Sequence, residues 1–180
     1  MPNKPEFVDV RVDPKTTAFL VLDLNARCED PKERCHRLIE PVADFLARAR
    51  EAKMFIVYTA ADRYRGTPQA RMPHAFKQQA DEPVLFPGAF DKFYGGGLQP
   101  LLQQRGIKGL IIAGASSNQA VLYTATAAVR PFGYDVIIPE DGLIARGDYE
   151  HEFTLHQFTI LPGGAAEKFK ITRFPRISFA

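Results

Sequence analysis

Apolar residues along the chain gather in two kinds of segment. Short, nearly continuous apolar runs occupy residues 17–23, 54–59, 109–113 and 135–138, and such runs are typical of parallel strands covered on both faces. Residues 42–52 instead repeat apolar positions at helical spacing, and residues 98–105, 119–130 and 149–161 are also predicted to be helices. Residues 83–86 and 170–172 predict short strands. The polar stretch 62–81 predicts a loop with some helix over one face.

Strands that alternate with helices in this way predict right-handed crossover units and a mostly parallel sheet with helices on both faces. A chain of 180 residues is most simply one domain, residues 1–180, with a proper buried core. Ligands of such α/β sheets bind at the carboxyl ends of the strands. Asp23, Thr59 and Gly114 stand at strand ends, so we expect the site there.

Composition mainly excludes function classes. Hydrophobic residues make up 46% and charged residues 24%, as in ordinary globular proteins. The net charge of +2, without a long basic run, predicts no nucleic-acid partner. The first ten residues lack the apolar core of a signal peptide, and no apolar run reaches the length of a membrane span, so we expect a cytoplasmic protein with no membrane partner. The spacing of Cys28 and Cys35 allows a disulfide, but two free thiols are the expectation there.

Residues 109–128, GLIIAGASSNQAVLYTATAA, carry the clearest chemical signal. The apolar run stops at Gly114, a small polar turn follows, and an alanine-rich helix begins. A strand, a tight turn and a helix start aim backbone N–H groups and the positive helix end at a ligand. The segment closely resembles the signature of the isochorismatase-like hydrolases, often called cysteine hydrolases, and Gly114, Asn118 and Val121 agree with it.

This resemblance runs from about residue 17 to the last strand and implies a three-layer α/β/α sandwich. Family members carry a nucleophilic cysteine at the start of the helix, but Ala120 occupies that position here. The resemblance also implies a cis peptide bond between Ala115 and Ser116 and an oxyanion-binding pocket around it. The candidate ligand-binding residues of the turn are Ala115, Ser116, Ser117, Asn118 and Gln119.

Two charged residues are the candidates for catalysis beside Ala120. In the family, the acid that corresponds to Asp23 activates the thiol or, in isochorismatases that lack the cysteine, protonates a vinyl ether. A carboxylate at the end of a buried strand is desolvated, which suits proton transfer, although Asp23 could also simply cap a turn. The catalytic lysine of the family falls near Pro87, and the nearest lysine is Lys92. We weigh Lys92 equally as a pocket cation and as a solvated surface residue.

The resemblance also suggests substrate-binding residues. Asn25 and Cys28 follow Asp23 where the family places pocket-lining side chains, and Cys28 is expected to be packed and unreactive. Phe93 begins a motif, FYGGGL, that corresponds to a family motif near the site. Arg63 and Tyr64, together with Arg71, could bind a substrate carboxylate from the loop over the site.

We expect neither a metal nor an organic cofactor. Nicotinamidase-like relatives hold a metal with an Asp-x-His pattern, but Tyr64 replaces that histidine here. His74 is isolated, and His151 and His156 are five residues apart, which is not a pair on one helix face. The glycines at 95–97 lack the spacing of a dinucleotide or phosphate loop, and no Gly-x-Ser-x-Gly elbow indicates a serine hydrolase.

The sequence therefore predicts a hydrolase that acts on a C–O or C–N bond of a small polar molecule by acid/base chemistry of Asp23. Family members commonly pair, so a homodimer or homotetramer is expected. Two alternatives stay open: a catalytically silent binding or scaffold protein, and a cysteine amidohydrolase inactivated by cysteine-to-alanine replacement at Ala120. We favour a natural alanine, because its surroundings also differ from the cysteine pattern. Every version requires that Asp23 and Ala120 face a shared cavity.

Overall fold

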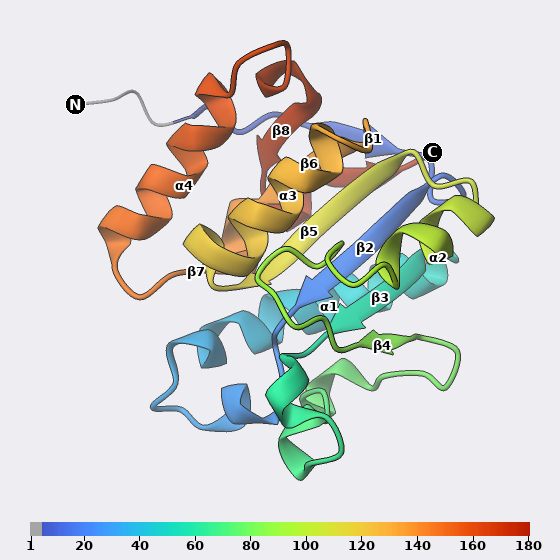
Figure 1. Ribbon diagram of the computed structural model, residues 1–180, viewed down its shortest axis with the longest axis vertical. Helices are drawn as coiled ribbons and strands as arrows, with labels where there is room; N and C mark the ends of the chain where they lie inside the picture. The colour runs from blue at the N-terminus through green and yellow to red at the C-terminus, as the bar shows by residue number, and fades with distance from the viewer. Residues whose placement is uncertain (1–4) are drawn as a thin grey trace.

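The apolar runs assemble into one parallel sheet in the computed structural model, which describes residues 5–180 (Figure 1). The strands are β1 Val10–Val12, β2 Thr17–Leu22, β3 Phe55–Thr59, β4 Val84–Leu85, β5 Gly109–Ala115, β6 Asp135–Pro139, β7 Leu143–Ile144, β8 Phe169–Thr172 and β9 Ile177–Phe179. The α-helices are α1 Ile39–Glu51, α2 Leu98–Gln104, α3 Leu122–Val129 and α4 Asp148–Ile160. Short 3₁₀ helices are η1 Ala26–Glu29, η2 Arg34–Leu38, η3 Asp62–Tyr64, η4 Pro68–Ala70, η5 His74–Phe76, η7 Glu140–Gly142, η8 Ala166–Lys168 and η9 Phe174–Arg176, and η6 Ser117–Val121 is a π-helical turn.

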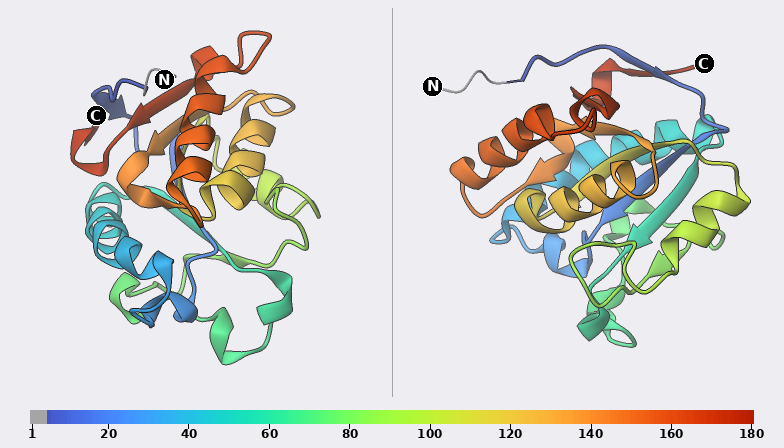
Figure 2. Two further views of the ribbon diagram at one scale, coloured as in Figure 1. Left: turned by 90° about the vertical axis from the view of Figure 1, so that its left-hand side faces the viewer. Right: turned by 45° about the horizontal axis from the view of Figure 1, so that its top comes forward.

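The central sheet has the strand order β4-β3-β2-β5-β6-β8, and β7 pairs with the last residues of β5. Its described strand pairs are all parallel, so the carboxyl ends of β2, β3, β5 and β7 meet at one edge. Helix α1 covers one face, and α2, α3 and α4 cover the other (Figure 2). The predicted three-layer α/β/α sandwich is confirmed.

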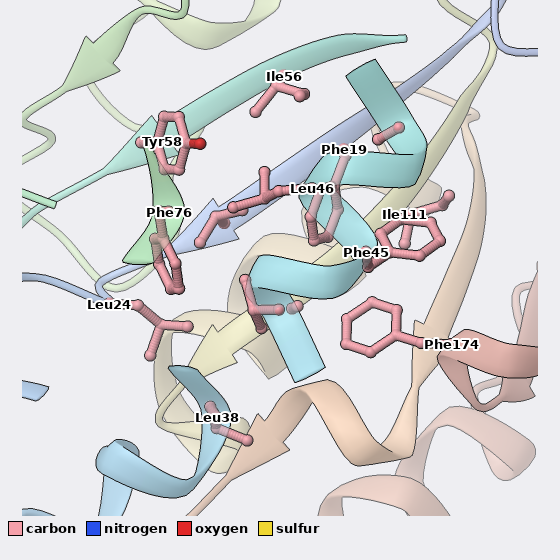
Figure 3. Close-up of a cluster of buried hydrophobic side chains, with 14 of the residues drawn as sticks. Phe19, Leu24, Leu38, Phe45, Leu46, Ile56, Tyr58, Phe76, Ile111 and Phe174 are labelled. Carbon is pink, nitrogen blue, oxygen red and sulfur yellow. The ribbon is translucent and has the colours of Figure 1, made fainter. Parts of the chain in front are cut away.

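The alternation of side chains along β2 explains how one apolar run serves two cores. Phe19 and Val21 point to the core under α1, whereas Leu20 and Leu22 point to the core under α2–α4. On the α1 side the ring of Phe19 meets Phe45 edge-on at 4.9 Å, as Figure 3 shows. A run that is apolar at every position is therefore required here.

Most predicted elements are present, with shifted ends. The helix predicted from residue 42 begins at Ile39, and the helix predicted from residue 119 begins as the π-helical turn η6 before it continues as α3. Strands β1, β7 and β9 were not predicted, because they have two or three residues each and therefore too little pattern to detect. In the described part of the chain, no helix is long and apolar enough to cross a bilayer.

Gly114 fixes the path of the chain at the end of β5. Its φ of +149° is rare for residues with a side chain, and a Cβ there would lie 2.2 Å from the carbonyl oxygen of Leu22. Only glycine lets β5 approach β2 this closely before the turn. The predicted cis peptide bond between Ala115 and Ser116 follows directly and is confirmed.

The expectation of two free thiols is wrong, because Cys28 and Cys35 form a disulfide. Helices η1 and η2 fold back on each other and bring the two Cα atoms to 5.1 Å, within the range of disulfide geometry. Sequence spacing alone does not reveal this fold-back.

Candidate active site

A cavity of about 1270 Å³ opens at the carboxyl edge of the sheet. Asp23 after β2 and Ala120 in η6 both line it, as the sequence analysis required. The cavity also receives most of the other predicted site residues. These are Asn25, Arg63, Tyr64, Lys92, Ala115, Ser116, Asn118 and Gln119. These residues come from four separate segments, which follow β2, β3, β4 and β5, and they converge on one space because parallel strands end side by side.

The carboxylate of Asp23 is held from two sides. Its Oδ2 lies 2.7 Å from the Nζ of Lys92, and its Oδ1 accepts a hydrogen bond of 2.9 Å from the hydroxyl of Thr59. The backbone N–H of Asp23 donates to the carbonyl of Thr59, and its φ of +57° lies in the left-handed region that aspartate tolerates better than most residues. The carboxylate therefore has a defined orientation at the cavity wall.

Lys92 lies in the interior and not on the surface. Its side chain is 2% exposed, and besides Asp23 its ammonium donates to the carbonyl of Ala89 at 3.2 Å. An ammonium has three N–H donors, so one donor has no acceptor among residues 5–180. Burying an ion pair gives little net stability compared with apolar packing, so its presence at a cavity points to a function other than stability.

The turn after β5 supplies further polar groups. The hydroxyl of Ser116 donates to the side-chain oxygen of Asn118 at 2.8 Å, which fixes both side chains at the cavity wall. The N–H groups of Ser117 and Asn118 begin the helical segment η6, where such groups lack intrahelical acceptors, whereas the N–H groups of Gln119 and Val121 donate to the carbonyl of Ser116. Ala120 contributes only a methyl group to the cavity wall and is 1% exposed, so it carries no nucleophile.

The cavity carries more basic than acidic side chains. Six basic residues line it against four acidic ones, and the acidic Asp23, Glu33 and Asp62 each pair with a basic residue. Arg63 donates to the hydroxyl of Tyr64 and lies 4.8 Å from the centre of its ring, which keeps the guanidinium at the wall without neutralising it. Arg146, which sequence reasoning missed, lines the same space from the segment after β7. The electrostatics therefore favour an anionic ligand.

Three predicted binding residues lie away from the cavity. Cys28 is fully buried in its disulfide, although its partner Cys35 does line the space. Ser117 is fully buried because η6 turns its side chain into the protein. Phe93 packs into the core, where its ring stacks on Phe132 at 4.6 Å.

Arg71, also considered as a carboxylate ligand, is committed elsewhere. Its guanidinium pairs with Glu29 and donates to the carbonyl of Met72. The hydrogen bond from Arg71 lowers the pKa of Glu29 to about 2, with help from the backbone N–H of His74. Arg71 therefore ties the loop after η4 to η1 and does not face the substrate space.

Within residues 5–180, no cluster of three or more histidine, cysteine, aspartate or glutamate side chains could hold a metal ion.

Comparison with known proteins agrees with this geometry. The family model of the isochorismatase domain matches residues 17–166. A cysteine hydrolase from Pseudomonas syringae pv. phaseolicola 1448A superposes with a TM-score of 0.77 at 19% identity, over 96% of this chain and 95% of that chain. An isochorismatase family protein from Desulfovibrio vulgaris subsp. vulgaris str. Hildenborough gives a TM-score of 0.75 at 20% identity, over 89% of this chain and 95% of that chain.

An N-carbamoylsarcosine amidase from Thermoplasma acidophilum is also similar, with a TM-score of 0.71 at 21% identity over 88% of this chain and 96% of that chain. A search among curated proteins gave no match. At these identities the solved structures show a shared fold, whereas the family model covers most of the chain. The resemblance seen in the sequence is confirmed, and the chain belongs to the isochorismatase family of the isochorismatase-like hydrolase superfamily.

Proposed function

We propose that this protein hydrolyses a C–O or C–N bond in a small anionic molecule, with Asp23 as the proton-transfer group and without a thiol nucleophile. The observation that carries the proposal is the Asp23–Lys92 pair, 2.7 Å apart, on the wall of a cavity that Ala120 also lines. A buried charge pair at a cavity, with one ammonium donor unused, is suited to stabilising charge that develops during a reaction.

With an amide or ester, Asp23 acts as a general base. A water molecule in the space beside Ala120 gives a proton to the carboxylate while its oxygen forms a bond to the carbonyl carbon. The carbonyl electron pair moves to its oxygen, which Lys92 and the N–H groups of η6 stabilise. The C–N or C–O bond then breaks, and the leaving nitrogen or oxygen takes up the proton from Asp23.

With a vinyl ether, the same carboxyl group acts first as a general acid. Asp23 gives its proton to the carbon of the double bond, water adds to the resulting cation, and a proton of that water returns to Asp23. The hemiketal then releases an alcohol and a carbonyl compound. Neither route needs a covalent intermediate at Ala120.

The substrate class follows from the charge around the cavity. Arg63 and Arg146 lie on segments after β3 and β7, which flank the ends of β2 and β5. A carboxylate on the substrate would be held there by charge-assisted hydrogen bonds, in which Tyr64 can join. Asn25 and the turn residues would contact the remaining polar atoms.

A substrate panel tests the proposal against both alternatives. It consists of small carboxylate-bearing amides, esters and vinyl ethers, each with its neutral methyl-ester counterpart. We expect the protein to hydrolyse one anionic class, with Asp23→Asn inactive. If only the Ala120→Cys variant hydrolyses the amides, the chain is an inactivated cysteine amidohydrolase. If neither protein hydrolyses anything while ligands still raise the melting temperature, the chain is a silent binding protein.

We also propose a single domain that works without a cofactor as a homodimer or homotetramer. Family members commonly pair into dimers or tetramers, and this supports the proposed homo-oligomer. Sedimentation velocity at micromolar concentration tests it, and a single species at the 20.1 kDa monomer mass would refute it.

A further inference from the structure

We propose that Thr124 is a positioning residue that clamps the loop carrying Lys92, so that its ammonium meets Asp23. The inference rests on the proposed function, because the pair that Thr124 would position is the pair to which the chemistry is assigned. Thr124 itself touches neither the cavity nor Asp23, and it would act only through Lys92.

The side chain of Thr124 holds the loop at two points. Its Oγ1 accepts a hydrogen bond of 3.0 Å from the backbone N–H of Lys92 and donates one of 3.3 Å to the carbonyl of Phe90. Thr124 is fully buried. One hydroxyl thus fastens the chain on both sides of Asp91, and water cannot replace it easily.

The loop is held by turns of its own after Lys92 and by this clamp at Lys92. The N–H of Phe93 donates to Oδ1 of Asp91 at 2.9 Å, and the N–H groups of Tyr94 and Gly96 donate to the carbonyls of Asp91 and Phe93. Residues 86–97 contain neither a helix nor a strand, and Gly95 and Gly96 take positive φ angles that glycine adopts readily. Lys92 is buried at 3% exposure, so its N–H would lose its acceptor without Thr124. An unpaired buried N–H costs more than an ordinary hydrogen bond contributes, so the backbone at Lys92 would move away.

The clamp also links Lys92 to the turn at the cavity. Thr124 lies four residues after Ala120 in one continuous helical segment, so the two side chains share a face of that segment. Figure 1 shows the loop passing beside the first turn of α3. The ring of Phe90 stacks on Tyr123 at 6.1 Å, directly before Thr124. One continuous helical segment therefore carries the turn at the cavity and, through Thr124, the contact that holds the lysine loop.

The test compares three variants of the full-length protein. Thr124→Val keeps the size but removes both hydrogen bonds, and Thr124→Ser restores the hydroxyl. Thr126→Val is the matched control, since Thr126 lies in the same helix and is only partly buried. Two quantities are measured: kcat and KM on the best substrate of the panel, and the rate at which an amine-reactive reagent labels Lys92, read by mass spectrometry.

We expect Thr124→Val to lower kcat by about tenfold, the equivalent of one lost buried hydrogen bond, with KM within about twofold. Labelling of Lys92 should become severalfold faster, since the loop no longer shields it. Thr124→Ser should recover both values, and Thr126→Val should change neither.

A purely structural threonine gives a different result. Thr124→Val would then lower the melting temperature but leave kcat per folded molecule and the labelling of Lys92 as in the parent protein, which overturns the inference. If the parent protein hydrolyses no substrate, the proposed function fails, and the labelling rates alone still decide whether Thr124 positions Lys92.

Discussion

Removal of the Asp23 charge should destabilise the protein more than removal of the Lys92 charge. The losses in free energy of unfolding of the two single variants should not add in the double variant. The side chain of Lys92 is 2% exposed, whereas that of Asp23 is 20% exposed. Asp23→Asn therefore leaves a buried ammonium with the carbonyl of Ala89 as its main partner, which costs about 3–5 kcal/mol. Lys92→Met leaves a carboxylate that Thr59 and cavity water still solvate, which costs about 1–2 kcal/mol.

The double variant removes both charges and should be no less stable than Asp23→Asn alone. The coupling energy should thus be at least as large as the loss in Lys92→Met, about 1–2 kcal/mol. Asparagine is the right replacement because it tolerates the positive φ of Asp23 as aspartate does. Urea unfolding at 25 °C and pH 7, followed by circular dichroism, gives the four free energies of unfolding that the cycle needs.

The exposed pair Lys168–Asp135, 3.1 Å apart, is the matched control, and its cycle should give less than about 1 kcal/mol. Two results would refute the reasoning. Either the losses at Asp23 and Lys92 add within about 0.5 kcal/mol, or Lys92→Met costs more than Asp23→Asn.

Three further predictions concern the frame of the site. Gly114→Ala should cost at least about 3 kcal/mol in urea unfolding, because its Cβ would meet the backbone oxygen of Leu22 at 2.2 Å; a parent-like midpoint would contradict this. Cys35→Ser should lower the free energy of unfolding by about 2 kcal/mol through loop-closure entropy, and adding a reductant to the parent protein should lower it by the same amount. An unchanged free energy of unfolding in both experiments would contradict this prediction. The Arg71 pair holds the pKa of Glu29 at about 2 in the folded protein against 4.5 ordinarily, so this stabilisation is present above pH 4.5 and lost as the pH falls towards 2. The stability advantage of the parent over Glu29→Gln should shrink across that range, and a constant difference would falsify the assignment.

Much of the fold could be predicted because its central strands carry their signal locally. Every residue of β2 is buried, and its run is apolar from Ala18 to Leu22, so this pattern indicated a central strand. The cis bond before Ser116 was predictable only through the family resemblance. By contrast, β7 has two residues, so nothing in the sequence placed Arg146 at the cavity.

The features that could not be predicted from the sequence depend on the course of loops. Lys92 sits in a segment without periodicity, so the sequence allowed a surface and a pocket position equally, and only its contact with Asp23 separates them. Phe93, its neighbour, was expected to bind substrate, but the chain direction at Lys92 turns the phenylalanine ring into the core. The disulfide of Cys28 likewise depends on a fold-back that spacing does not encode.

The most direct test of the central claim is kcat/KM of Asp23→Asn on the best substrate, relative to the parent protein, in which residue 120 is alanine. If Asp23 moves the proton in the chemical step, the variant should lose at least about a hundredfold in kcat/KM while remaining folded. A folded Asp23→Asn variant within about threefold of the parent would contradict the account.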